Sequence, residues 1–246
     1  MKKLITVLVA VVGLSASVVS ISAAEITGSF SVDYFNKYVD RNGLKLYGAP
    51  VFQPSLTLNL PKNTYFDLWG SYGPAGPSDD FGNELDVTVG RTGEFKGLTL
   101  DYGLTYYTIA PLDQQKDDVF LPFVEAGKTL SLDSLGEQEV SLYLRFEVVI
   151  PNTIYTGGTR VYLGGRMRNQ TPLPRLSLNH DLSVMHDSGG FGVNRGFVVN
   201  YKGGADWALE KGRILTFPKV QWYKPLTKFS DRQVELVLGA GFSFNF

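Results

Sequence analysis

Residues 232–246 read RQVELVLGAGFSFNF, and this stretch decides how the rest of the chain is interpreted. Apolar side chains alternate along it with small or polar ones, which is typical of a β-strand with one apolar face. The apolar face ends in aromatic rings, as in strands that cross a membrane interface. That face consists of Val234, Leu236, Leu238, Ala240, Phe242, Phe244 and Phe246, and the other of Gln233, Glu235, Val237, Gly239, Gly241, Ser243 and Asn245.

The aromatic end also resembles the C-terminal strand of bacterial outer-membrane barrels. In those proteins the strand typically ends in Phe and is recognised by the barrel-assembly machinery. The resemblance implies that Phe242, Phe244 and Phe246 form an assembly signal, and that the assembly machinery is a partner of this chain.

Residues 1–24 have the pattern of a secretory signal peptide. Lys2 and Lys3 form a positive start, residues 4–12 are almost wholly apolar, and small residues precede a cleavage site after Ala24. A membrane anchor is the alternative, but Gly13 and several serines make the segment a poor membrane span. We expect residues 25–246 to form a single exported domain.

The composition excludes several classes of protein. The chain has no Cys, so it has no disulfide framework, and its net charge of -1 gives no reason to expect nucleic acid as a partner. A mean hydropathy of -0.03 does not exclude a membrane barrel, because alternating strands hide their apolar face from an average. A closed barrel would also stabilise a chain without disulfides, since it leaves no strand edge unpaired.

Runs with a period of two recur along the chain, and no long helical pattern interrupts them. They predict an all-β fold, a transmembrane antiparallel up-and-down β-barrel of about 12 strands in the outer membrane of a Gram-negative bacterium. An even number returns both chain ends to the periplasmic side. The expected strands are residues 26–38, 51–60, 65–72, 83–92, 98–109, 119–132, 138–150, 158–168, 174–185, 193–202, 214–223 and 232–246.

The connections follow the asymmetry of such barrels, with short periplasmic turns at 61–64, 93–97, 133–137 and 169–173 and mostly longer outer loops. The connection near 203–211 is longer than expected, and Pro218 interrupts strand 214–223. A secreted β-sandwich would show similar alternation. Two features favour the barrel: the charged residues gather on the alternate strand positions that are not apolar, and the chain has three alternating phenylalanines in its last strand.

The inward parity of the expected strands is rich in charge. Acidic residues come from the first half and basic residues from the second, so we expect two opposed walls and a transverse field across the lumen. The acidic residues are Asp33, Asp67, Glu84, Asp86, Asp101 and Glu125, and the basic residues are Arg145, Arg160, Arg166, Arg168, Arg175, Lys202 and Lys219.

Such a lumen predicts a porin-like channel for passive diffusion of small hydrophilic solutes. Because Arg binds carboxylates and phosphates well, anions are the expected preference. The alternative is a structural or adhesion barrel whose lumen is closed by salt bridges between the opposed charges. The expected partners are outer-membrane lipids and small hydrophilic solutes.

Enzymatic activity is not expected. His186 and Ser188 are two residues apart, as in outer-membrane phospholipase barrels, which also have twelve strands, but a glycine-rich outer loop explains the same residues. A hydrolase is therefore a second alternative. His180 lies between Leu178 and Leu182 on the lipid-facing parity, and the sequence has no metal-ligand cluster and no sign of a cofactor.

Residues 27–110 resemble the TorF-like porin family. The resemblance is carried by Ser31-Val32-Asp33-Tyr34, residues 50–53, Leu68-Trp69-Gly70-Ser71, Glu84-Leu85-Asp86, Gly90 with Gly93, Asp101-Tyr102-Gly103 and Tyr106-Tyr107. This chain departs from the family at Asn36-Lys37-Tyr38, where members have Arg-Gly, and at Ile109-Ala110-Pro111, where members have Tyr-Pro. The resemblance implies a small outer-membrane barrel with a transport role and no established substrate.

Overall fold

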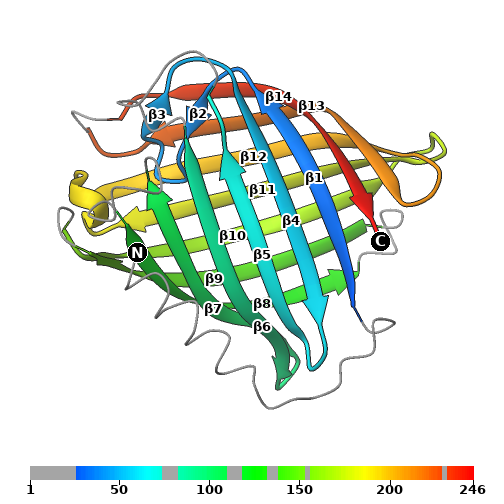
Figure 1. Ribbon diagram of the computed structural model, residues 1–246, viewed down its shortest axis with the longest axis horizontal. Helices are drawn as coiled ribbons and strands as arrows, with labels where there is room; N and C mark the ends of the chain where they lie inside the picture. Colours follow the sequence, from blue (N-terminus) through cyan, green and yellow to red (C-terminus); the bar gives the residue numbers. More distant parts are fainter. Residues whose placement is uncertain (1–25, 74–82, 110–117, 132–137, 153–155, 229–231) are drawn as a thin grey trace.

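The computed structural model describes residues 26–73, 83–109, 118–131, 138–152, 156–228 and 232–246. Twelve antiparallel strands form a closed barrel, which confirms the predicted fold class (Figure 1). The expected signal peptide, residues 1–24, and the expected turn at 133–137 lie outside the described residues. No helix in the described part of the chain has the length and apolar character of a membrane span.

The barrel strands follow one another around the wall in chain order. They are β1 (Thr27–Phe35), β4 (Val51–Leu60), β5 (Thr64–Ser71), β6 (Glu84–Phe95), β7 (Leu98–Ile109), β8 (Val119–Ser131), β9 (Gln138–Pro151), β10 (Gly158–Gln170), β11 (Leu176–Asp187), β12 (Gly196–Ala208), β13 (Arg213–Pro225) and β14 (Glu235–Asn245). The barrel closes where β1 pairs with β14, with Phe30 opposite Phe244. Closure gives each of the twelve barrel strands a paired neighbour on both sides.

The alternation along β14 has the predicted orientation. Leu236, Leu238 and the three phenylalanines are exposed on the outside, whereas Val237 is buried. The small inner residues leave room for side chains of other strands. A Cβ at Gly239 would overlap the Phe35 ring, and a Cβ at Gly241 would overlap Asp33 Oδ1 and lie 3.0 Å from Lys219 Nζ.

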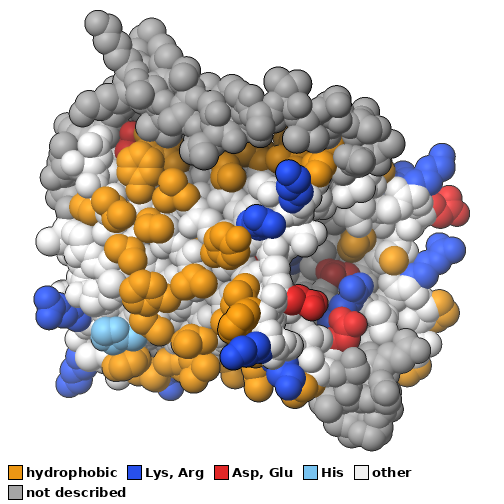
Figure 2. Space-filling model, turned by 90° about the horizontal axis from the view of Figure 1, so that it is seen from below, with side chains coloured by type: hydrophobic (Ala, Val, Ile, Leu, Met, Phe, Trp, Pro, Cys, Tyr) orange, Lys and Arg blue, Asp and Glu red, His pale blue; other side chains and the backbone are white. Residues whose placement is uncertain are grey.

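The outer surface of the barrel is apolar. Figure 2 shows hydrophobic side chains spread over one side of the barrel, beside a hollow where acidic and basic side chains gather. This is the reverse of a soluble domain and matches a wall that faces lipid. The exposed apolar side chains include Phe30, Leu104, Val124, Leu144, Leu163, Leu182, Leu215 and Leu238.

Several strand limits differ from the prediction in the second half of the chain. β11 begins at Leu176, so Arg175, with a φ of 68°, lies in the turn before it. β12 continues to Ala208, because Gly203 and Gly204 stay paired with β13 and are not a turn. The connection before β13 is therefore as short as the other turns at its end of the barrel.

Two further differences concern β13 and β14. β13 accommodates Pro218 by a register shift between Thr216 and Lys219, so the interrupted strand forms. β14 begins at Glu235, and Arg232 lies before it as a buried side chain. The structure thus moves one basic side chain from the expected strand into the loop between β13 and β14.

The first connection is not an open loop. Strand β1 stops at Phe35, and residues 38–47 form a small hairpin of β2 (Tyr38–Val39) and β3 (Lys45–Tyr47). This β2–β3 hairpin belongs to the end of the barrel opposite the short turns, which we call the long-loop end (Figure 1). Its Tyr38, Val39 and Tyr47 are buried with residues of the barrel wall.

Candidate functional site

The β2–β3 hairpin is held inside the long-loop end of the barrel by apolar packing. Its core partners include Phe35, Val51, Val198, Tyr223 and Val237, which come from five neighbouring strands of the wall, β1, β4, β12, β13 and β14. The hairpin turns at Gly43, whose φ is 79°, and Gly43 N donates to Asp40 O at 2.8 Å. Glycine suits this position because a side chain is strained at positive φ.

Polar contacts fix the β2–β3 hairpin to strands around the circumference. Arg41 Nη1 donates to Glu147 Oε1 on β9 at 3.0 Å, and Arg41 Nη2 donates to Tyr107 Oη on β7 at 2.9 Å. The remaining anchors are Tyr38 to Glu84 on β6 at 2.8 Å, Asp40 to Arg160 on β10 at 3.2 Å, and Lys37 and Lys45 to Glu235 on β14. The hairpin therefore spans the lumen at this level.

Burial further favours the neutral form of one anchor. Burial raises the pKa of the Tyr38 hydroxyl well above its usual value, and the nearby Glu84 carboxylate adds to the effect. Tyr38 is neutral at physiological pH, as tyrosines ordinarily are, and donates its hydrogen bond to Glu84 Oε2.

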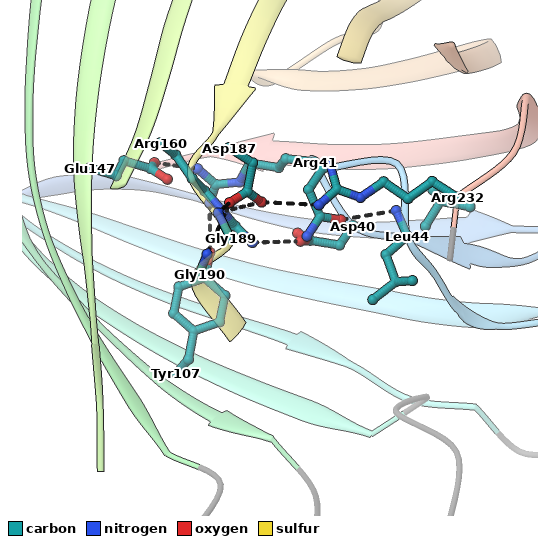
Figure 3. A network of polar contacts seen from close by, with 12 residues as sticks. Asp40, Arg41, Leu44, Tyr107, Glu147, Arg160, Asp187, Gly189, Gly190 and Arg232 are labelled. Atoms are coloured by element: carbon teal, nitrogen blue, oxygen red, sulfur yellow. Dashed lines mark hydrogen bonds and ion pairs between the residues drawn. The ribbon is translucent and has the colours of Figure 1, made fainter. Parts of the chain in front are cut away.

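A second buried network adjoins the hairpin at the long-loop end (Figure 3). Asp187, with a fully buried side chain, lies 3.6 Å from Arg160 Nε and 3.3 Å from Arg232 Nη2. Asp187 Oδ1 also accepts hydrogen bonds from Gly189 N and Gly190 N. One carboxylate thus joins β10, the loop after β11 and the loop before β14.

A cavity of about 910 Å³ lies in the lumen, with the hairpin residues Tyr38 to Arg41 among its lining. Eight carboxyl side chains and seven Lys or Arg side chains line it, so the two signs nearly balance. A lumen with this lining suits water and polar solutes better than apolar ones.

Many of the inward charges pair with close neighbours. Glu125 lies 2.6 Å from Arg166 and 3.6 Å from Arg145, Arg166 lies 3.4 Å from Asp181, and Lys219 pairs with Asp33. These pairs reduce the field between the expected walls. A separation remains, because Lys202 on β12 and Asp86 on β6 both line the cavity, with five strands between β12 and β6 in either direction.

The structure brings most of the predicted lumen residues to the cavity. Those that line it are Asp33, Asp67, Asp86, Glu125, Arg145, Arg166, Arg168, Lys202 and Lys219. The other four predicted lumen residues do not line the cavity. Glu84 and Arg160 are buried in the hairpin contacts, Asp101 accepts a hydrogen bond from Tyr65 Oη at 3.0 Å, and Arg175 lies in a turn.

The β2–β3 hairpin and its contacts with the barrel wall were not predicted from the sequence. Asp40, Asn42 and Gly43 are residue types common in turns, and Asn42 Oδ1 accepts a hydrogen bond from Leu44 N at 2.9 Å. Nothing local indicated that Arg41 would reach Glu147, which is 106 residues away. An inward Glu147 among arginines was the one available signal.

The His186 and Ser188 pair has a structural role in the described residues. Ser188 Oγ accepts a hydrogen bond from Thr159 N at 2.7 Å, which ties the loop after β11 to β10. The His186 ring packs on Phe197 with centroids 4.7 Å apart. Potential metal ligands do not gather in groups of three or more within the described ranges.

Comparisons with known proteins support the fold. Neither a protein-family model nor a curated protein sequence matches the chain. The KdgM porin is similar in structure with a TM-score of 0.55 at 10% identity, over 89% of this chain and 99% of the porin. The NanC porin gives a TM-score of 0.56 at 7% identity, over 89% of this chain and 100% of that one.

A third similar structure is the translocator domain of the autotransporter NalP from Neisseria meningitidis. Its TM-score is 0.55 at 11% identity, over 99% of this chain and 98% of that domain. At such identities the similarity shows the barrel fold alone, and the three proteins include both porins and an autotransporter domain.

Proposed function

We propose that the protein is an outer-membrane channel for passive diffusion of small hydrophilic solutes, with the β2–β3 hairpin as its constriction. The observation that carries the proposal is the polar-lined cavity of about 910 Å³ inside a closed barrel with an apolar exterior. The resemblance of residues 27–110 to TorF-like porins and the fold shared with two porins point the same way.

The short turns mark the periplasmic end of the channel and the hairpin its extracellular end. Residues 1–24 are the proposed signal peptide, with cleavage after Ala24, and outer-membrane lipids cover the apolar belt. Swelling of liposomes that contain the purified protein tests the channel. Sugars and small organic acids are expected to enter, and size exclusion is expected to be stricter than in a barrel without an inward hairpin.

A preference for anions is the finer part of the proposal. Arg168 and Lys202 line the cavity, and neither is within 4.0 Å of a carboxylate in the described residues. Guanidinium and ammonium groups that are free of partners attract carboxylates and phosphates. Because the lining charges nearly balance, the preference is expected to be weak, and reversal potentials in a salt gradient measure it.

The second candidate is a structural or adhesion barrel with a closed lumen. The hairpin that spans the long-loop end favours it. Such a barrel would show no swelling with any solute. A hydrolase is less supported, since Ser188 Oγ is used by Thr159. A phospholipid hydrolysis assay of the parent and Ser188→Ala distinguishes that role.

The end of β14 is proposed as the signal read by the barrel-assembly machinery. Phe242, Phe244 and Phe246 are exposed on the outside, and Phe246 exchanges two backbone hydrogen bonds with Gly28. Phe246→Ala is expected to lower the amount of assembled barrel in cells. Phe95→Ala, at an equally exposed aromatic residue of β6, is the control and is expected to leave assembly unchanged.

A further inference from the structure

Three inward side chains lie side by side across β5, β6 and β7, close to the hairpin. Trp69 is paired in register with Asp86, and Asp86 is paired in register with Tyr107. All three line the cavity. A carboxylate therefore lies in a row between two aromatic side chains.

Asp86 lacks a partner for one of its oxygens. Its exposed fraction is 7%, and Asp86 Oδ1 has no hydrogen-bond partner in the structure. The ion pairs of the described residues do not include it. A buried carboxylate oxygen without a donor is costly, so this site favours a ligand that supplies positive charge or a donor.

The surroundings of Asp86 select the kind of cation. Trp69 packs on Tyr38 of the hairpin with ring centroids 5.8 Å apart, so aromatic surface borders the site from the wall and from the hairpin. Aromatic faces attract organic ammonium groups, which shed water more readily than small metal ions. Metal ions need several oxygen ligands, and the described residues hold no group of three or more Asp, Glu, His or Cys side chains that could supply them.

The other charges near Asp86 leave the site negative. Arg41 is the nearby cation, and its two terminal nitrogens donate to Glu147 and Tyr107. Glu84 lies two residues along the same inward face and accepts the Tyr38 hydrogen bond. Asp40 also lines the cavity. A ligand with an ammonium group therefore enters a region with more carboxylates than cations.

We propose that Trp69, Asp86 and Tyr107 form a binding site for an organic ammonium group under the hairpin. As a statement about which solutes use the channel, the inference rests on the proposed function. The expected solutes of the channel are then small molecules that carry an ammonium group. If such a solute is a zwitterion, its acid group is free to face the Lys202 side of the lumen. As a statement about binding, it holds for the barrel whether or not solutes cross.

Calorimetry on the folded, full barrel in detergent tests the site, with choline as the probe. Its neutral carbon isostere, 3,3-dimethylbutan-1-ol, has nearly the same shape without the charge. Choline is expected to bind saturably and the isostere at least about tenfold more weakly. Asp86→Asn is expected to weaken choline binding at least about tenfold.

Asp67→Asn is the matched control. Asp67 lines the same cavity but already accepts hydrogen bonds from Ser55 and Thr57, so its loss is expected to change choline affinity by less than about twofold. If Asp86→Asn does not fold, Trp69→Leu serves instead. It is expected to weaken the binding of choline while leaving the binding of the isostere unchanged.

The site is refuted if choline fails to bind, if the isostere binds equally well, or if both Asp variants weaken choline equally. These results are independent of conductance. A barrel that binds choline but conducts nothing refutes the channel and retains the site, and a barrel that conducts but does not distinguish choline from its isostere refutes the site alone.

Discussion

Arg41 Nη1 lies 3.0 Å from Glu147 Oε1, so an ion pair joins the β2–β3 hairpin to the far wall of the barrel. The Glu147 side chain is only 1% exposed, and Arg145 Nε also contacts it at 2.7 Å. A buried carboxylate that loses one of its cations is destabilised. The position of the hairpin and the charge of the wall therefore depend on each other.

Replacing Arg41 with Gln is expected to loosen the hairpin. It leaves Glu147 with fewer donors, and we expect the free energy of unfolding to fall by about 1–3 kcal/mol. Single-channel conductance is expected to rise, because the constriction is less firmly held. Lys62→Gln, in an exposed turn, is the control, and an unchanged conductance in Arg41→Gln would argue against the hairpin as the constriction.

Asp187 is expected to be among the most sensitive positions in the long-loop end. Asp187→Ala leaves the buried Arg160 and Arg232 without their shared carboxylate, which costs about 3–5 kcal/mol in comparable buried pairs. Asp187→Asn retains an oxygen for Gly189 N and Gly190 N and is expected to lose less. Guanidinium unfolding in detergent measures both.

Glu210→Ala, in the exposed turn before β13, provides the control for Asp187 and is expected to change stability by no more than about 0.5 kcal/mol. If Asp187→Ala is as stable as Glu210→Ala, the buried network does not hold the loops.

Gly241 is expected to tolerate no side chain. In Gly241→Ala the new methyl group meets the Asp33 carboxylate and the Lys219 amine, and we expect a loss of about 1–3 kcal/mol. Gly93→Ala, whose Cβ would meet nothing within 4 Å, is expected to stay within about 0.5 kcal/mol. Equal stabilities of the two variants would contradict the role of the small inner face of β14.

Ion selectivity is expected to depend on position along the lumen. Arg168→Glu reverses a charge that lines the cavity and should shift the reversal potential toward cation preference. Arg175→Glu makes the same change in the turn before β11, outside the cavity lining, and should shift it far less. Equal shifts would mean that the lining does not set selectivity.

The strands of the barrel wall were predicted well from the sequence, because each wall strand shows its two faces as a local alternation of residue types. In β14 the lipid-facing Leu236 and Phe242 and the inner Gly241 are all set by a period of two, which is a local property. Pro218 weakened the prediction of β13, yet the strand forms because a register shift absorbs it. Strand ends were less accurate, as Arg175 illustrates.

The site was predicted only in part, because its defining contacts are not local. Parity placed Glu125 and Arg166 inside, but their pairing depends on which side chains lie at the same level of a closed barrel. The inward hairpin depends on Arg41 meeting Glu147 and on Tyr38 meeting Glu84. Parity places both carboxylates inside the barrel, but the local pattern does not identify their partners.

Single-channel recording in a planar bilayer shows whether the barrel is open and whether the hairpin narrows it. The parent barrel is compared with a variant in which residues 38–47 are replaced by a short Gly-Ser linker. We expect a small, discrete conductance for the parent and a clearly larger one for the variant, because the hairpin spans the lumen. A parent barrel that conducts no ions would contradict this expectation and identify the closed barrel.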